Sequence, residues 1–566
     1  MKNIVLKDVL KNALAYEGKT NAKAILGLVL REKPELKKDL PALLKLIEAA
    51  VKEVESLSLD EIKAKIKAEF PKLLEVKKEE EKIEGPLKPL PEAKIGQVIT
   101  RIAPSPSGPL HIGHAYGLAL NYEYAKMYKG KLILRIEDTN PENIYPPAYD
   151  LIQEDANWLS DNGISEVIVQ SSRLGIYYDY AEKLIQINKA YVCTCPAEEW
   201  TEKKNKALEC PCRSLSTKEN LLRYAKLFNE YAEGEAIVRL KTDLQDKNPA
   251  MRDFGLMRIV EHIHPKTGKE QRVWPLMVFS VAIDDHETKV SHVLNGKDHT
   301  DNAAKERIIM SYFGWTPPIY KHWGRINFEG FELSTSQTRR AIEENKYHGW
   351  DDIRLPFLQA LKKRGYQPAA LRKFAMEIGL SLNDKTVSPE EFWKMINAFN
   401  KDIIDPKSKR FFFVEEPHLI EIKNAPSKTV EIACHPEFPA LGKRKISATN
   451  KFYITKKDFQ QLTEGPVHRL MDYCNFRIKG KIFNYESETY EEYKNASDKG
   501  QIIHWLPENG NVEVEVLLDT DVKSLGLGEN SLKNCKEGEI IQLERRFFVR
   551  INKKEKDIIR CLFLHR

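Results

Sequence analysis

The sequence has no apolar run close to the roughly 20 residues that a membrane-spanning helix needs. Its first residues, MKNIVLKDVLKNALAYEG, also lack the uninterrupted apolar stretch of a secretion signal, because Lys, Asp and Asn interrupt them. These absences argue against a membrane protein or an exported one, so we expect a cytoplasmic protein. At 566 residues the chain exceeds what one hydrophobic core supports, which predicts several domains.

Cysteine is also scarce, with eight residues in the chain, and four of these lie in one short segment. Cys193-Thr-Cys195 and Cys210-Pro-Cys212 form two CxC pairs. In a cytoplasmic protein such clustering favours a metal over disulfides, and four thiolates suit a tetrahedral zinc ion. We therefore predict a structural Zn2+ site without an open coordination position, with reduced, metal-free thiols as the alternative.

No sign of charge dominates the chain, whose formal net charge is +6. A basic surface suits a polyanion, but a chain of this length can reach +6 by chance, so charge alone does not decide for nucleic acid. Basic and aromatic residues interleave near the C-terminus, as in Lys451-Phe452-Tyr453 and Arg545-Arg546-Phe547. Such residues hold phosphates and stack on unpaired bases, although each alone is more typical of a solvated strand face.

Helical periodicity marks the first part of the chain. Apolar residues recur at three- and four-residue steps over positions 43–54 and 62–70, and Ser58 to Glu61 forms a capping box for the second helix. The stretch 77–94 contains KKEEEK and then GPLKPLPEAK, a composition typical of an extended linker. We predict a helical extension with a packing or partner-docking role, followed by this linker.

A βαβ unit is predicted between residues 97 and 140. The run from Val98 to Ala103 has strand composition and ends at the turn-forming segment PSPSGP. A helix begins at HIGH and continues to Tyr128, and a second strand covers residues 131–136. Parallel strands of such a unit bind ligands at their carboxyl ends.

Two histidines, His111 and His114, occupy the first turn of the predicted helix. An HxxH pair alone is commonly a surface accident. After a strand and a Pro/Ser/Gly turn, however, both imidazoles and the free N–H groups of the helix would point toward the ligand crevice, where phosphate binds well. Gly113 lies between the histidines, and its missing side chain lets an adenine lie flat against the backbone.

The segment RIAPSPSGPLHIGHA resembles the first signature of class I aminoacyl-tRNA synthetases, in the glutamyl and glutaminyl branch. The segments KLILRIEDTNPE, VWPLMVFSVAIDDH, HVLNGKDHTDN, YFGW, HWGRINFEG and GWDDIRLPFLQALKKRGYQP are similar to that branch in the expected order. The SPSG turn and the RIEDTNP strand look more like glutamyl than glutaminyl enzymes. The helical extension is similar to that of archaeal and eukaryotic members.

The resemblance implies a multidomain α/β fold whose parts follow one another along the chain. These parts are a helical extension with its linker (1–95), a Rossmann-like class I catalytic domain in two halves (96–190 and 266–345), a zinc-bearing acceptor-binding insertion between the halves (191–265), a helical connector (346–404) and anticodon-binding β-barrels (405–566). Helical periodicity over residues 350–400 and short alternating runs beyond residue 405 agree with the last two parts.

The resemblance also implies the reaction, which is ligation of L-glutamate to tRNA(Glu) with ATP and Mg2+. His111 and His114 would contact the ATP phosphates and stabilise the α-phosphorus as the glutamate carboxylate attacks it. A ribose hydroxyl of the tRNA would then attack the acyl adenylate. tRNA(Gln) is a second candidate substrate beside tRNA(Glu).

Amino-acid recognition is expected to depend on a guanidinium group. The resemblance implies that Arg101 binds the glutamate side chain, with Ser105 and Glu137 around the amino acid, and a structural ion pair is the alternative for Arg101. Trp274 and Ser280 are expected to line the same pocket, although aromatic core packing explains Trp274 almost equally well.

The second signature of the family is altered in this chain. The mobile ATP loop of class I enzymes carries lysine, but its counterpart here, ELSTSQTRR at 332–340, has none. The resemblance implies ATP contacts by four loop residues: Ser334, Thr335, Ser336 and Gln337. Gln337 stands where archaeal relatives often have lysine, so we expect Arg339 to contact the leaving pyrophosphate. The alternative is that Arg339 and Arg340 bind tRNA phosphate or stay solvated.

Asn295, in HVLNGKDH, is a second departure, because the family usually has arginine near the amino acid. Two rival functions therefore stay open. One is a glutaminyl-tRNA synthetase, and the other is a tRNA-binding paralogue with impaired catalysis. The intact HIGH segment favours phosphate chemistry.

Overall fold

The structure, a computed structural model, describes residues 2–16, 18–70 and 87–566 and divides into two units, Met1–Glu84 and Gly85–Arg566. Residues 77–86 of the predicted linker lie outside the described residues. Within the described parts, no helix combines the length and the apolar character that crossing a bilayer requires.

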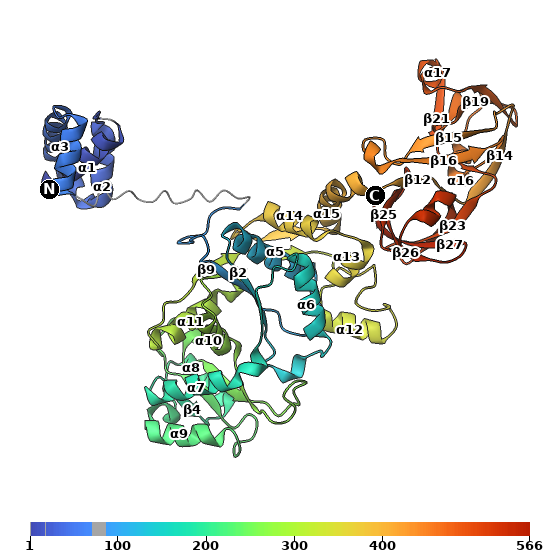
Figure 1. Ribbon diagram of the computed structural model, residues 1–566. Helices are drawn as coiled ribbons and strands as arrows, with labels where there is room; N and C mark the ends of the chain where they lie inside the picture. The colour runs from blue at the N-terminus through green and yellow to red at the C-terminus, as the bar shows by residue number, and fades with distance from the viewer. Residues whose placement is uncertain (1, 17, 71–86) are drawn as a thin grey trace. The chain divides into compact units, whose positions relative to one another are not determined.

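The first unit is a helical bundle (Figure 1). Each helix turns one apolar stripe inward, and Val9, Ile25 and Ile47 are fully buried in one shared cluster. The predicted capping box is confirmed, because the Ser58 N–H donates to the Glu61 carboxylate at 2.8 Å and Ser58 Oγ accepts from the Glu61 N–H. Its α-helices are α1 (Lys2–Ala15), α2 (Ala22–Glu32), α3 (Leu40–Glu55) and α4 (Leu59–Glu69).

The predicted βαβ unit is confirmed in the second unit. Strand β1 (Ile99–Ile102) leads through α5 (Ile112–Met127) to β2 (Lys131–Ile136), and β1 and β2 pair in parallel. After α6 (Ala148–Leu159), strand β3 (Glu166–Val169) pairs in parallel with the outer edge of β2. The interior strand β2 is buried on both faces after Lys131, as expected for a sheet covered by helices.

A second parallel pair forms its own two-stranded sheet and lies beside β1. Strands β8 (His292–Gly296) and β9 (Ile319–Trp323) pair in parallel around α11 (Thr300–Tyr312). The Ser291 N–H donates to the Ile99 carbonyl at 3.0 Å, which brings the start of β8 beside β1. The strand order therefore reverses between β1 and β8, and parallel α/β sheets bind ligands at such a point.

The segment that we expected to be the end of the linker packs on this sheet domain instead. Leu87 and Leu90 are buried, and the Leu90 N–H donates to Tyr128 Oη at 2.8 Å. His292 Nε2 bonds the Pro91 carbonyl at 2.9 Å. Residues 87–94 are thus anchored by apolar burial and hydrogen bonds that a Pro-rich composition does not reveal.

The chain between the two halves of the sheet forms an antiparallel layer. Its strands run in the order β4–β5–β6–β7, and α7 (Leu174–Gln186), α8 (Ala197–Asn205) and α9 (Thr217–Lys226) accompany them. The strands are β4 (Ala190–Cys193), β5 (Ile237–Leu240), β6 (Gly255–Ile259) and β7 (Val273–Pro275). The last strand follows residue 265, where we predicted the insertion to end.

Helices dominate the next part, as the periodicity predicted. After α10 (Met277–Glu287) and the sheet, the chain forms the ATP-loop counterpart and its helix α12 (Thr335–Glu343). Strands β10 (Ile326–Phe328) and β11 (Lys385–Val387) form a short parallel pair, and α12 and the two helices after it lie between them in the chain. The remaining helices are α13 (Leu358–Arg364), α14 (Pro368–Ile378) and α15 (Pro389–Ile404).

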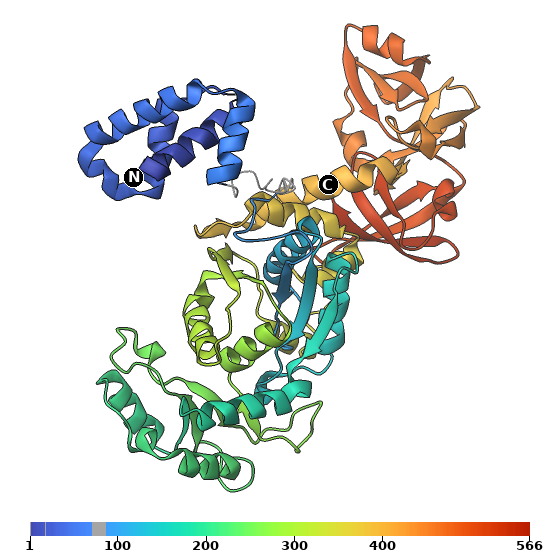
Figure 2. The same ribbon diagram turned by 60° about the vertical axis from the view of Figure 1, so that its left-hand side comes forward.

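The C-terminal part, orange to red in Figure 2, is built of β-strands, as predicted. One seven-stranded sheet has the order β12–β25–β26–β27–β23–β24–β13, so its strands come from both ends of this part of the chain. A second seven-stranded sheet, β21–β18–β19–β20–β14–β17–β22, is formed by the chain between them. The strands of the first sheet are β12 (Arg410–Phe411), β13 (Phe413–Glu415), β23 (Asn511–Leu517), β24 (Lys523–Glu529), β25 (Ile540–Leu543), β26 (Phe547–Lys554) and β27 (Ile558–His565). Those of the second are β14 (Pro417–Lys423), β17 (Lys451–Thr455), β18 (Val467–Leu470), β19 (Cys474–Lys479), β20 (Ile482–Ser487), β21 (Lys499–Ile503) and β22 (Leu506–Pro507).

Candidate active site

The two histidines of the HIGH segment form a stacked pair at the start of α5. Their ring centroids lie 3.8 Å apart with 28° between the planes. His111 is the N-cap of α5, and its Nδ1 accepts a hydrogen bond from the Gly113 N–H at 3.1 Å. A Cβ on Gly113 would lie 2.9 Å from the His111 ring, so this stacked arrangement needs glycine at that position.

The hydrogen bonds of this pair determine which ring nitrogen carries the proton. The His111 N–H donates to His114 Nδ1 at 3.4 Å, so Nδ1 is an acceptor in both rings. Burial lowers the pKa of His114 to about 4, and burial together with His114 lowers the pKa of His111 to about 2. Both imidazoles are therefore neutral near pH 7, and their protons lie on Nε2, where each can donate to an anion.

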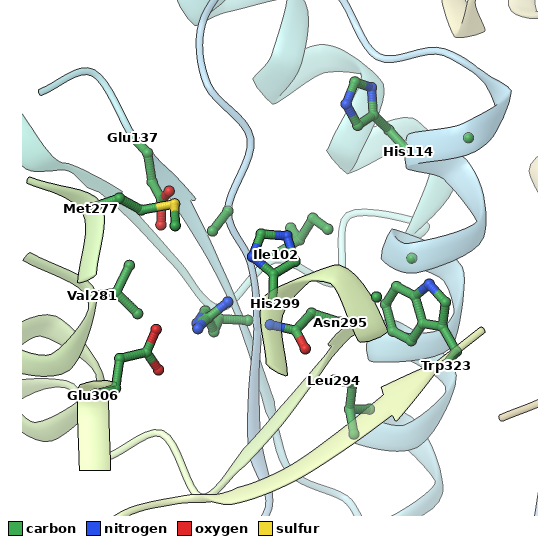
Figure 3. Close-up of a pocket in the computed structure, with 15 residues that line it drawn as sticks. Ile102, His114, Glu137, Met277, Val281, Leu294, Asn295, His299, Glu306 and Trp323 are labelled. Carbon is green, nitrogen blue, oxygen red and sulfur yellow. The ribbon is translucent and has the colours of Figure 1, made fainter. Parts of the chain in front are cut away.

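A cavity of about 200 Å³ opens at the carboxyl ends of β1, β2 and β8. We call it the charge-lined cavity, because Arg101, Glu137 and Glu306 contribute to its wall. In Figure 3, Glu137 and Glu306 lie on one side, and His114 and Trp323 on the other. Gly113, Asn295 and His299 also line it. Polar groups from separate elements therefore converge at the point where the strand order reverses.

Arg101 is embedded in a buried charge network. Its Nε and Nη2 donate to the two carboxylate oxygens of Asp285 at 2.9 and 3.0 Å. Arg135 donates to Asp285 at 2.5 Å and to Glu137 at 3.0 Å. Burial alone would raise the pKa of Asp285, but Arg101 and Arg135 outweigh it and hold that pKa below its usual range. The second Nη of Arg101 is left as the edge that can reach a ligand.

A second cavity, of about 330 Å³, lies between the SPSG turn and α12. We call it the turn–loop cavity. Its lining includes Ser105, Glu137, Thr335, Ser336 and Arg339. Since Glu137 lines both cavities, they are neighbours.

The turn and the loop of this cavity touch directly. Ser107 Oγ and Thr335 Oγ1 lie 3.1 Å apart, and a Cβ on Gly108 would come within 3.0 Å of Thr335. The glycine of the SPSG turn therefore permits the close approach of α12.

The ATP-loop counterpart presents an arginine to the cavity. Arg339 lies 3.9 Å from Glu343 and over the Tyr145 ring at 5.7 Å, with 40% of its side chain exposed. An ion pair as exposed as this one contributes little, so the guanidinium group can move to a ligand. Gln337 is exposed and lines neither cavity. With its amide nitrogen toward Glu332 it donates to that carboxylate at 2.8 and 3.1 Å.

Five predicted residues line neither cavity: His111, Trp274, Ser280, Ser334 and Gln337. Trp274 is fully buried within the core and stacks on His264 at 4.9 Å, which corrects our prediction that it lines the pocket. Ser280 is also fully buried and donates to the Met277 carbonyl at 3.2 Å. Met277 and Val281, four residues apart on α10, line the cavity instead. Ser334 caps α12 by accepting from the Gln337 N–H at 3.3 Å and lines neither cavity.

Sequence reasoning missed Arg135, Asp285 and Glu306. One signal was available for the first two, because an arginine within the apolar strand KLILRI and a carboxylate within the apolar helix VFSVAIDD must find buried partners. Asn295, noted as a departure, lines the charge-lined cavity and bonds His322 Nδ1 at 2.7 Å.

The four clustered cysteines come together in the antiparallel layer. Their sulfur atoms all lie within 4.8 Å of one another, with 3.9 Å between Cys193 and Cys210 and 3.8 Å between Cys195 and Cys212. A tetrahedron with Zn–S bonds of about 2.3 Å requires sulfur separations of about 3.8 Å. The donor set and its spacing therefore fit a zinc ion.

Comparison with known proteins identifies the family. A family model described as the catalytic domain of class I tRNA synthetases (E and Q) matches residues 97–406, and two anti-codon binding domains of the same class match 408–496 and 502–552. The chain is 42% identical to a glutamate–tRNA ligase of Pyrococcus furiosus over 100% of both chains. It is 41% identical to that of Methanocaldococcus jannaschii, again over 100% of both. The chain therefore belongs to the class I tRNA synthetases of the E and Q type, with a catalytic domain followed by anticodon-binding domains.

Proposed function

We propose that this chain is an ATP-dependent ligase that attaches L-glutamate to tRNA(Glu) through a glutamyl adenylate. The observation that carries this proposal is the meeting of the two cavities at Glu137, one with a guanidinium group and one with the turn, the loop and Arg339. The relatives from Pyrococcus furiosus and Methanocaldococcus jannaschii, both glutamate–tRNA ligases, support it.

The histidine pair acts on the phosphates of ATP. The glutamate α-carboxylate attacks the α-phosphorus, a mixed anhydride forms, and the bond to the pyrophosphate oxygen breaks. His111 and His114 donate Nε2–H bonds to the charge that develops on the phosphate oxygens. Because the backbone N–H groups already occupy Nδ1 of both rings, the donors are oriented before the substrate arrives.

Arg101 selects the acidic side chain of the substrate. Asp285 holds its guanidinium group through two bonds, so the remaining Nη presents a fixed donor to a carboxylate in the cavity. Glu137, which faces both cavities, binds the α-ammonium group next to the reacting carboxylate, and Ser105 lies beside it in the turn–loop cavity. A ribose hydroxyl at the tRNA end then attacks the anhydride carbonyl, and AMP leaves.

Arg339 takes the place of the missing loop lysine at the leaving pyrophosphate. Thr335 and Ser336 line the cavity with it, and the N-terminus of α12 adds free N–H groups there. Mg2+ neutralises phosphate charge when it is bound. It is commonly held by substrate phosphates and water rather than by a protein cage.

The cysteine cluster binds a structural zinc ion in an acceptor-binding insertion. Zinc analysis should find one ion per chain, and Cys212→Ser should release it because the site then offers three thiolates. Cys434→Ser changes a buried cysteine outside the cluster and is the matched control. Retention of zinc by the Cys212 variant would contradict the assignment.

We further propose the division of the chain that the sequence predicted, with boundaries near 95, 190, 265, 345 and 404, and a cytoplasmic location. The C-terminal sheets bind the anticodon, and basic and aromatic residues of their strands contact phosphates and bases. These parts supply affinity for the whole tRNA, whereas the two cavities perform the chemistry.

The function is tested by charging separate transcripts of tRNA(Glu) and tRNA(Gln) with glutamate and with glutamine, followed on acid gels. We expect glutamate on tRNA(Glu). Glutamine on tRNA(Gln) would indicate a glutaminyl enzyme, and binding of tRNA without any charging would indicate a paralogue without catalysis. Glutamate on both transcripts would extend the proposed function to tRNA(Gln).

A further inference from the structure

Glu306 is a buried carboxyl group of α11 that the proposed mechanism does not use. It is 4% exposed and lines the charge-lined cavity together with Arg101. Its contact is with Tyr320, whose Oη donates to Glu306 Oε2 at 2.9 Å. Asp285 and Glu137 are paired with guanidinium groups, but within the described residues Glu306 has no ion-pair partner.

The charges around Glu306 are already balanced without it. Arg101, Arg135 and Arg173 provide three positive charges, and Asp284, Asp285 and Glu137 provide three negative charges. An ionised Glu306 would leave the buried group with a net negative charge. The acidic substrate side chain would add another, and like charges in a buried site repel strongly.

The other groups near Glu306 offer little compensation. Tyr320, on β9, donates one neutral hydrogen bond, and Arg307 of α11 lies over the Tyr320 ring at 4.6 Å. His299 lines the same cavity with a half-exposed ring, and Asn295 is neutral. Among the residues that line this cavity, Arg101 is therefore the one permanent cation.

Burial first, and then the charge of Asp285, raise the pKa of Glu306 to about 7, although Arg101 opposes this shift. A carboxyl group in that range gains or loses its proton with little free-energy cost near neutral pH. Glu306 and Arg101 line the same cavity, so a carboxylate that binds the free Nη occupies the cavity that Glu306 also lines.

We propose that Glu306 determines specificity for the acidic side chain by taking up a proton and donating a hydrogen bond to the glutamate carboxylate. The proposal rests on the proposed function. The proton comes from solvent, no covalent bond changes, and the product is a carboxylic acid bonded to a carboxylate that Arg101 also holds. An ionised Glu306 would instead accept a hydrogen bond from the side-chain amide of glutamine. The protonation state of Glu306 therefore determines whether the cavity favours glutamate or glutamine.

Calorimetry with sulfamoyl analogues of glutamyl and glutaminyl adenylate tests this on the wild-type chain. Each titration is run at pH 6 and pH 8 in two buffers of different ionisation enthalpy. At pH 8 the glutamyl analogue should take up about one proton more than the glutaminyl analogue, and at pH 6 it should take up close to none. The α-ammonium group is common to both ligands, so it cancels in the comparison.

The dissociation constants give a second readout. Below pH 7 Glu306 already carries its proton in the free enzyme, so Kd for the glutamyl analogue should be flat, and above pH 7 it should rise about tenfold per pH unit. Glu306→Gln keeps a donor that does not titrate, so its Kd should stay flat through pH 8. A wild-type proton uptake equal for both analogues, or an unchanged pH dependence in Glu306→Gln, overturns the inference.

The outcome also separates this inference from the proposed function. If the chain charges tRNA(Glu) with glutamate but shows no proton linkage, the proposed function stands and the inferred role of Glu306 is wrong. If the chain neither charges tRNA(Glu) nor prefers the glutamyl analogue to sulfamoyl adenosine, both the proposed function and the role of Glu306 are wrong.

Discussion

The two cavities that meet at Glu137 differ in how deeply their polar and charged groups are buried. In the charge-lined cavity the ionised groups are buried, with Arg101 at 7% and Asp285 at 1% exposure, and two hydrogen bonds of 2.9 and 3.0 Å join them. In the turn–loop cavity Ser105 and Ser336 are exposed, and Arg339 has only a long, solvated ion pair. A buried network is costly to alter, whereas a solvated loop can rearrange around a ligand.

This difference in burial predicts how the two cavities respond to substitution. In the turn–loop cavity the loop has Gln337 where the resemblance led us to expect lysine, and Arg339 on the same helix lines the cavity. The buried network offers no such freedom, because removing one charge leaves its partner unpaired. Substitutions in the two cavities should therefore differ in size and in kind.

The largest effect is expected for Arg101→Ala, which empties the guanidinium site of the charge-lined cavity. It should lower kcat/KM for glutamate by about 10³, because a buried charged pair is broken and the substrate carboxylate loses its donor. Steady-state aminoacylation over a range of glutamate concentrations measures this.

Arg173→Ala is the matched control for that change. Arg173 bonds Asp284 at 2.8 Å in the adjacent network but does not line the cavity. It should affect thermal stability and leave KM for glutamate within about threefold, since surrounding contacts to Asp284 remain. Equal losses in both variants would show that Arg101 acts only in structure.

A somewhat smaller effect is expected for His114→Ala, which changes the wall of the charge-lined cavity at α5. Loss of one preorganised donor should lower kcat by about 10² to 10³ while KM for glutamate changes little. His111→Asn is a useful companion, since asparagine keeps an N-cap acceptor for the Gly113 N–H and removes the ring. If kcat of His114→Ala fell by less than about threefold, the phosphate role of the pair would be wrong.

The smallest of the three effects is expected in the turn–loop cavity. Arg339→Ala should lower kcat by about 10², near the lower end for loss of a charged donor, because the loop can adapt. Arg340→Ala lies on the same helix, is exposed and does not line the cavity, so it should stay within about twofold of wild type. Similar kcat values for the two variants would remove Arg339 from the mechanism.

Much of the fold could be predicted because its signals are local. The strand at 131–136 and the capping box at Ser58 follow from periodicity and spacing that neighbouring residues carry. The pairing of Arg101 with Asp285 joins positions 184 residues apart, and nothing in either local pattern specifies it. The anchoring of residues 87–94 on Tyr128 was missed for the same reason.

The candidate site shows the same limit at the level of single side chains. The segment VWPLMVFSVAIDDH predicted that α10 approaches the pocket, but the rotation of the helix decides which residues face it. Met277 and Val281 do so, whereas Ser280 turns toward Gln170 and Trp274 packs in the core. A motif locates an element more reliably than it locates each side chain.

ATP–pyrophosphate exchange, measured with tRNA(Glu) present, tests the central claim most directly, because it reports adenylate formation where the two cavities meet. The account predicts exchange that depends on glutamate and is at least about tenfold weaker with glutamine at pH 7. Absence of exchange with glutamate, while the folded chain still binds tRNA, would contradict it.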